Sequence, residues 1–153
     1  MNDKSALLNP DGRLSDELAL QLFLARKTKS LWAKQVNKPI KVQTLEGSVA
    51  VEPGNYLCRG IQGEVWPQKA SKLLDKYLRS DEVDAKGWRR FDPKPAAAPV
   101  EAARVPYPFR VIAQWGELAG KVNDYVVRST TDPTDIWIVD KTIFEASYER
   151  GLH

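Results

Sequence analysis

The residues best suited to hold a ligand include two arginines that occupy matching places in the chain. Arg59 and Arg128 each follow a tyrosine by three positions. A guanidinium group presents a fork of donors that fits a carboxylate or a phosphate, so the two arginines predict an anion clamp. The alternative is that each pairs across its own hairpin, Arg59 with Glu64 and Arg128 with Asp135. Cross-strand ion pairs of this kind are the more common outcome.

A second candidate site is the segment Trp88-Arg89-Arg90-Phe91, in which two aromatic residues enclose two cations. Such a segment can stack on single-stranded bases, or it can anchor a protein, because Trp and Arg are typical interface anchors. The alternative is that Trp88 and Phe91 pin the neighbouring proline-rich chain onto the domain. We take Trp88, Arg89, Arg90 and Phe91 as candidate contacts for a protein partner.

A basic cluster near the N-terminus suggests a different partner. The formal net charge is +3, and Arg26, Lys27 and Lys29 lie close together in the chain. With Arg89 and Arg90 they would supply phosphate contacts, which makes a nucleic-acid-binding accessory protein the alternative function. So small a surplus, with acids interspersed elsewhere, is nevertheless more typical of a solvated surface.

Residues for catalysis are sparse. The chain has one histidine, His153, and one cysteine, Cys58. These are too few for a histidine-centred catalytic site, a Cys/His zinc site or an internal disulfide. No nucleophile-elbow, phosphate-loop or zinc-protease motif occurs. A small enzyme would have to use a carboxylate pair such as Glu64 and Asp75. We therefore lean towards a binding protein without metal or cofactor, and the sequence identifies no catalytic residue.

The elements that must position these residues recur within the chain. At an offset of 69 residues, the segment from Pro39 to Arg59 aligns with the segment from Pro108 to Arg128. A two-residue insertion in the second half then changes the offset to 71. At this offset Trp66 aligns with Trp137, and Tyr77 aligns with Tyr148. Each half shows four short strands and a helix. The sequence thus predicts an α+β fold of two pseudo-symmetric repeats of mainly antiparallel strands, each closed by a helix, plus an N-terminal helix.

Composition divides the chain further. Ser15 can cap a helix, and Leu18, Leu22, Ala25 and Trp32 lie near one helical stripe. Between the halves, Asp92–Pro99 and Val105–Pro108 contain five prolines, and these stretches are expected to be extended with no regular structure. The expected segments are an N-terminal helical segment 1–38, a first repeat 39–78, a connector 79–107 and a second repeat 108–153, with 39–153 forming one compact unit.

The first half resembles the PGDYG-type domain, a small and largely uncharacterised family of bacteria and their phages. The matching motifs are Thr44-Leu-Glu-Gly47, Pro53-Gly-Asn-Tyr56, Gly60-Ile-Gln-Gly-Glu64 and Trp66-Pro67, with the family's closing motif matched best at Ile143-Phe-Glu-Ala-Ser-Tyr148. Asn55 stands where the family has aspartate, and Leu57 stands at the last glycine of the named turn. The resemblance supports the order of strands and implies no activity.

The sequence shows no recognisable targeting signal. The longest apolar-rich stretch, Leu18–Ala25, is much too short to span a membrane. A single cysteine without a secretory signal fits a reducing cytoplasm. The sequence therefore predicts a cytoplasmic, non-enzymatic module for protein–protein interaction that does not engage a membrane.

Overall fold

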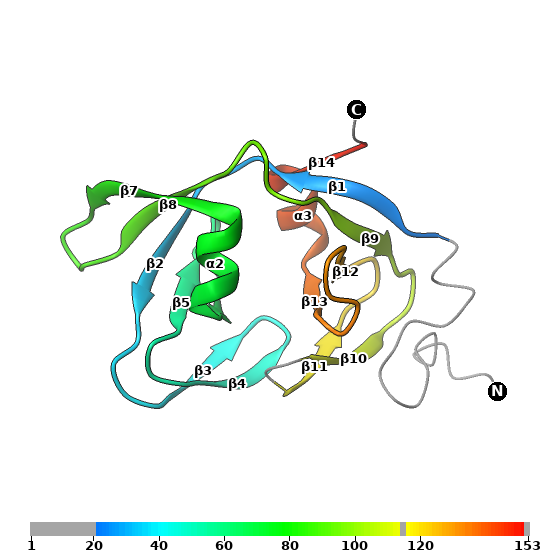
Figure 1. The fold of residues 1–153 in the computed structure, drawn as a ribbon. Coiled ribbons are helices and arrows are strands. Elements are labelled where there is room, and N and C mark those ends of the chain that lie inside the picture. Colours follow the sequence, from blue (N-terminus) through cyan, green and yellow to red (C-terminus); the bar gives the residue numbers. More distant parts are fainter. Residues whose placement is uncertain (1–20, 114–115, 152–153) are drawn as a thin grey trace. The chain divides into compact units, whose positions relative to one another are not determined.

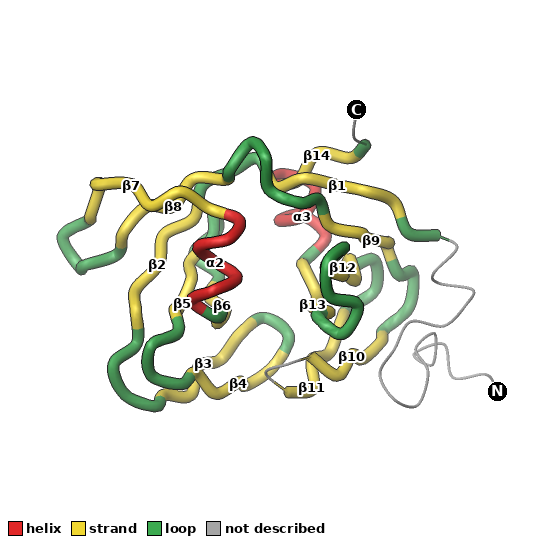
Figure 2. The backbone as a smooth tube through the Cα atoms, in the orientation of Figure 1, coloured by secondary structure: helices red, strands yellow, loops and turns green. Residues whose placement is uncertain are grey.

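The computed structural model describes residues 21–113 and 116–151, which are built mainly from antiparallel β-sheet (Figure 1). Of these residues, 52% lie in strands and 11% in helices. The expected α+β class is therefore wrong. The two helices are α2 (Ala70–Lys76) and α3 (Lys141–Ser147), and each makes only about two turns (Figure 2). Neither helix closes its repeat, since a further strand follows each one directly.

The chain divides into two compact units, which we call the continuous unit and the discontinuous unit. The continuous unit is residues 28–97, and the discontinuous unit joins residues 1–27 to residues 98–153. The boundaries expected after residues 38, 78 and 107 do not coincide with this division. The expected division treats 39–153 as one compact body, whereas the structure separates it into parts of two units.

The continuous unit holds a five-stranded sheet and a separate hairpin. Its strands are β2 (Leu31–Gln35), β3 (Ile40–Thr44), β4 (Gly47–Val51), β5 (Tyr56–Arg59), β6 (Val65–Gln68), β7 (Tyr77–Val83) and β8 (Arg89–Pro93). The sheet has the order β6-β5-β2-β8-β7, and the hairpin β3–β4 contacts β6. In Figure 1, β7 and β8 extend past α2 towards the turn that joins them.

The discontinuous unit has the same arrangement. Its strands are β1 (Phe23–Lys27), β9 (Val100–Arg104), β10 (Phe109–Ala113), β11 (Gly116–Gly120), β12 (Tyr125–Ser129), β13 (Ile136–Val139) and β14 (Tyr148–Arg150). The sheet has the order β13-β12-β9-β1-β14, beside the hairpin β10–β11. Strand β1 thus takes the place of β8, although β1 comes from the start of the chain and β8 from the end of its unit.

Residue pairings match between the two sheets. Tyr56 lies opposite Gln35, and Tyr125 lies opposite Arg104, which stands 69 positions after Gln35. At the other edge, Tyr77 lies opposite Pro93. Its equivalent Tyr148 lies opposite Lys27, so the pairings also relate positions in β8 to positions in β1 that sequence alignment does not relate.

One local expectation fails in the described residues, and another holds for most of its range. The N-terminal helix expected to run through Ala25 and Trp32 is wrong, because these residues lie in strands β1 and β2. Its proposed start at Ser15 lies outside the described residues. In the connector 79–107, residues 94–99 and 105–107 have no regular structure, as expected, whereas the remainder contains most of β7 and all of β8 and β9. Pairing with strands distant in the chain, which local periodicity does not encode, fixes these segments as sheet.

Each unit has its own hydrophobic core between sheet and helix. In the continuous unit the core consists of Leu31, Ala33, Tyr56, Cys58, Leu73, Tyr77 and Phe91, with Trp66 packed against it. In the discontinuous unit it consists of Ala25, Val100, Ala102, Tyr125, Val127 and Phe144, with Trp137 packed against it. The equivalent tryptophans therefore support the cores, as their alignment predicts.

The turn before β5 or β12 anchors the helix in each unit. Asn55 accepts a hydrogen bond through Oδ1 from the backbone N–H of Ala70, at 3.2 Å. Asp124, the equivalent residue, accepts one through Oδ1 from the N–H of Lys141, also at 3.2 Å. Each side chain satisfies a donor that the first turn of a helix leaves without an internal partner. No helix in the described part of the chain is long and apolar enough to cross a membrane.

Candidate functional site

The predicted tetrad Trp88–Phe91 is divided between the two faces of the sheet, because successive side chains of a strand point to opposite sides. Phe91 lies opposite Leu31 on the face that carries the core, and it is fully buried. Arg90 lies opposite Trp32 on the other face. The four residues therefore do not form one contact surface, and Phe91 is part of the core of the continuous unit.

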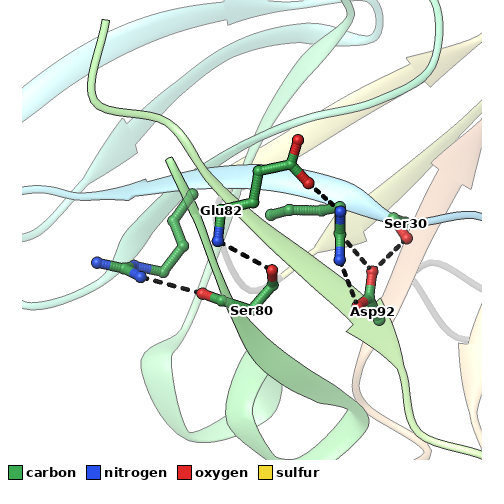
Figure 3. A network of polar contacts seen from close by, with 6 residues as sticks. Ser30, Ser80, Glu82 and Asp92 are labelled. Atoms are coloured by element: carbon green, nitrogen blue, oxygen red, sulfur yellow. Dashed lines mark hydrogen bonds and ion pairs between the residues drawn. The ribbon is translucent and has the colours of Figure 1, made fainter. Parts of the chain in front are cut away.

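Strand β7 contains an irregularity that determines where the two arginines reach. Arg79 pairs with Phe91 and Val83 pairs with Arg89, so β7 has extra residues between these two pairings. Arg89 donates through NH1 to the backbone carbonyl oxygen of Ser80 in this bulge, at 3.0 Å (Figure 3). The guanidinium of Arg89 thus satisfies a carbonyl group that the bulge removes from the regular ladder.

Arg90 is held by two carboxylates. Its guanidinium pairs with Glu82, and its Nε lies 3.0 Å from Oδ1 of Asp92 (Figure 3). Ser30 donates through Oγ to the same Asp92 oxygen at 2.5 Å. The Ser30 hydrogen bond is the main cause that lowers the pKa of Asp92, and Arg90 adds to it against the opposing effect of partial burial. The charge of Arg90 is therefore neutralised within the continuous unit.

Arg59 lies between aromatic rings and a carboxylate on the face opposite the core. Its guanidinium carbon is 4.7 Å from the centre of the Trp88 ring and 5.8 Å from that of Trp32. Its NH2 is 3.2 Å from Oδ2 of Asp84. The expected pairing of Arg59 with Glu64 is wrong. Oε1 of Glu64 instead accepts a hydrogen bond from the N–H of Gln62.

Asp84 organises the turn between β7 and β8. Its Oδ1 accepts hydrogen bonds from the backbone N–H groups of Lys86, at 2.9 Å, and Trp88, at 3.0 Å. Partial burial alone would raise the pKa of Asp84, but these two backbone donors and Arg59 outweigh it, and the pKa lies below its ordinary value. The turn is thus fixed by an ionised carboxylate.

Arg128 also has a different partner from the one expected. It lies directly opposite Glu101 across β12 and β9, and its NH2 is 3.0 Å from Oε1 of Glu101. The pairing with Asp135 is therefore wrong. Each of the two equivalent arginines is engaged by a carboxylate of its own unit, so neither is left as an open anion clamp.

The residues of the nucleic-acid alternative belong to both units. Arg26 and Lys27 lie in β1 of the discontinuous unit, where Nζ of Lys27 is 5.9 Å from the centre of the Tyr148 ring. Lys29 is exposed and belongs to the continuous unit, like Arg89 and Arg90. These cations therefore do not form a single stripe along one element.

A cavity of about 360 Å³ lies within the continuous unit, on the part of the sheet near the β7–β8 turn. It is lined by the cations Lys34, Arg79, Lys86 and Arg89, by Gln35, Tyr56 and Gly87, and by the apolar residues Ala33 and Phe91. No carboxylate is among these residues. Of the cavity's cations, only Arg89 was predicted from the sequence as a contact residue. The alternation of β7 and β8 would have placed Arg79 and Arg89 on one face, had these segments been recognised as strands.

Several groups in this cavity have no strong partner in the described residues. The guanidinium of Arg79 is exposed and makes no ion pair or hydrogen bond with them. The Tyr56 hydroxyl makes no hydrogen bond with them either; it reaches solvent, since no described polar side-chain atom is both buried and unsatisfied. Lys34 lies with Nζ 5.0 Å from the centre of the Trp88 ring. The cavity thus offers donors to a ligand.

The catalytic alternative finds little geometric support. Glu64 lies in the turn before β6 and Asp75 is exposed on α2, and neither lines the cavity. Cys58 is buried in the core of the continuous unit. Among the described residues, no group of three or more His, Cys, Asp or Glu side chains is arranged to hold a metal ion.

Comparison with known proteins adds no relative. No family model, curated protein or solved structure matches the chain. The resemblance to the PGDYG-type domain therefore stays a prediction, and the site must be interpreted from its own chemistry.

Proposed function

We propose that this protein is a non-enzymatic binding module that captures an acidic segment of a partner protein at the cavity of the continuous unit. The observation that carries the proposal is the charge of the cavity lining, which contains Lys34, Arg79, Lys86 and Arg89 and no carboxylate. Cations gathered around a concave surface without counter-ions attract anionic groups and steer their approach.

The apolar part of the cavity favours a protein over a nucleic acid as the partner. Ala33 and Phe91 form buried parts of its lining, and Tyr56 adds an aromatic ring with a hydroxyl group. A peptide can place carbon atoms against the exposed part of Tyr56, above the buried Ala33 and Phe91, while its carboxylates meet the cations. Nucleic-acid binding needs a larger set of open cations, and Arg90 is already neutralised by Glu82 and Asp92.

We propose further that the protein works in the cytoplasm and is a divergent member of the PGDYG-type family. The motifs in residues 44–67 support the family assignment. The chain's one cysteine, Cys58, is buried in a core, which suits a reducing compartment. Neither proposal changes the expected chemistry of the cavity.

The test is binding of a fluorescently labelled peptide of Asp and Glu residues, followed by fluorescence anisotropy at low salt. We expect saturable binding that weakens as salt is added. Arg79→Gln and Lys86→Gln should each weaken binding about three- to fivefold, the size of a solvent-accessible ion pair. Lys41→Gln is the matched control, because Lys41 is an exposed lysine of the same unit that does not line the cavity.

Two outcomes would overturn the proposal. One is that the peptide does not bind at low salt, or binds equally to the cavity variants and to wild type. The other is that a single-stranded oligonucleotide binds more tightly than the peptide and loses affinity in Arg79→Gln and Lys86→Gln. The second result would instead make the cavity part of a nucleic-acid site.

A further inference from the structure

The two units provide an internal comparison for the cavity. Ala33 and Ala102 occupy equivalent places, opposite Cys58 and Val127 in the neighbouring strands. The residue across from Ala33 on its other side is Arg89. Across from Ala102 it is Phe23. The position of Arg89 in the continuous unit is therefore the position of Phe23 in the discontinuous unit.

Phe23 packs against aromatic residues of its own unit. Its ring lies edge-on to Tyr125, with centroids 6.2 Å apart, and edge-on to Phe144, with centroids 6.0 Å apart. The guanidinium carbon of Arg150 is 4.1 Å from the centre of the Phe23 ring. The discontinuous unit thus uses one of its own phenylalanines at the site that is open in the other unit.

The continuous unit keeps two of the neighbours of that ring but not the ring, and it has the buried Leu73 in place of Phe144. Tyr56 is the equivalent of Tyr125, and Arg79 is the equivalent of Arg150. Both residues line the cavity. Arg89 does not fill it, because its guanidinium donates to the carbonyl of Ser80. The aromatic residue of β8, Phe91, is at the place of Ala25 and is fully buried in the core, where its ring lies edge-on to Tyr56 with centroids 5.7 Å apart.

From this comparison we infer that the cavity takes an aromatic side chain of the acidic partner segment, in the position that Phe23 occupies in the other unit. The inference rests on the proposed function and names the ligand's anchor. The incoming ring would lie against Tyr56 and under Arg79, as Phe23 does with Tyr125 and Arg150. Acidic residues beside the ring would then meet Lys34, Lys86 and Arg89.

Cavity size and charge agree with this ligand. About 360 Å³ lies near the lower end of ligand sites, which are roughly 300–1,000 Å³. It suits one large side chain better than an extended ligand. A cation over a ring face is attracted by it, and an edge-on aromatic pair adds to the burial of the ring. Arg79 and Tyr56 therefore favour an aromatic over an aliphatic anchor.

Three labelled peptides separate this inference from the proposed function. The first has one Phe flanked on both sides by Asp residues, the second has Ala in place of Phe, and the third keeps Phe and has Asn in place of each Asp. We expect the first to bind about tenfold more tightly than the second, and the third to bind weakly. Equal binding of the first and second would overturn the aromatic anchor and leave acidic recognition intact. No binding of the first would overturn both.

The decisive variant is Arg89→Phe, which copies the residue of the discontinuous unit. It should fill the cavity with a ring and reduce binding of the Phe peptide by about tenfold or more, while urea unfolding shows that the protein remains folded. In Arg79→Gln, the preference for Phe over Ala should shrink, whereas Lys41→Gln should leave it unchanged. Full binding of the Phe peptide by a folded Arg89→Phe variant would show that the cavity is not the site.

Discussion

Arg89 and Phe23 occupy the same position in two sheets of equal strand order, each directly across from an alanine. Phe23 packs on Tyr125 and Phe144, whereas Arg89 turns to the backbone of Ser80. One arrangement therefore fills its site with an aromatic ring, and the other leaves a cavity with four cations. This difference, rather than any feature common to both units, defines the candidate binding site.

The hairpins of the two units have different residue pairs at one equivalent cross-strand position. Ile40 lies opposite Val51 in β3–β4, and Phe109 lies opposite Gly120 in β10–β11. A side chain added at Gly120 would overlap the buried Phe109 ring. We expect Gly120→Val to lower the free energy of unfolding by about 1–3 kcal/mol, measured by urea denaturation.

Adding Phe109→Ile to Gly120→Val should recover most of this loss, because the double variant reproduces the pair Ile40 and Val51. Phe109→Ile alone serves as the control for the volume that is removed. A double variant no more stable than Gly120→Val would contradict equivalent packing of the two hairpins.

The buried carboxylate of Asp124 is predicted to act as a hydrogen-bond acceptor at the start of α3. It accepts from the N–H of Lys141 and, through Oδ2, from the N–H of Lys121 at 2.9 Å. Asp124→Ala leaves both donors without this acceptor and should destabilise the protein by about 1–3 kcal/mol in urea. Asp124→Asn keeps an acceptor, as Asn55 does at the equivalent place, and should cost less than the alanine variant. Equal losses would show that the acceptor is not what matters.

The ion pair of Arg128 with Glu101 is predicted to stabilise the fold measurably. Both side chains are partly buried and lie directly opposite each other. A double-mutant cycle with Arg128→Gln and Glu101→Gln should give a coupling of about 0.5–1 kcal/mol in urea unfolding. The exposed pair Arg110 and Glu117 is the matched comparison, and its coupling should be smaller. A coupling for Arg128 and Glu101 no larger than for this exposed pair would count against the assigned partner.

Asp84 should make stability depend on pH in the acid range. Its pKa in the folded protein lies below the ordinary value of 3.8, because backbone donors and Arg59 outweigh the effect of partial burial. The ionised carboxylate therefore stabilises the folded state above that ordinary value, and the stabilisation is lost as the pH falls through the lowered pKa. Melting temperatures of wild type and Asp84→Asn should differ most at neutral pH and converge in acid. A constant difference across the range would show that titration of Asp84 is not involved.

Local sequence is informative where neighbouring residues determine the backbone. The four strands expected in the first repeat are present as β3 to β6, and the helix expected in that repeat is present over Ala70–Lys76. Alternating side chains and the glycine turns at Gly47 and Gly60–Gly63 mark such hairpins because their pairing partners lie a few residues apart. The internal offset likewise relates Tyr56 to Tyr125, and these residues have equivalent pairings in the structure.

Segments whose partners are distant were predicted wrongly from the same sequence. Strand β1 is bordered by β9 and β14, each more than 70 residues away in the chain. No local pattern in residues 23–27 indicates that β9 and β14 are the neighbouring strands, and the spacing of apolar residues there also fits a helix. The bulge in β7 similarly depends on its pairing with β8, so the reach of Arg89 to Ser80 was not predictable.

The sequence by itself therefore determined the hairpins, the equivalence of the two halves and the surplus of positive charge. Tertiary structure decided which carboxylate each arginine meets, since Asp84 and Glu101 come from strands and turns remote from Arg59 and Arg128. It also decided that Arg79 and Arg89 share a cavity while Phe91 is buried. The physical reason is that the face and neighbours of a strand residue depend on register with other strands, and long-range burial sets that register.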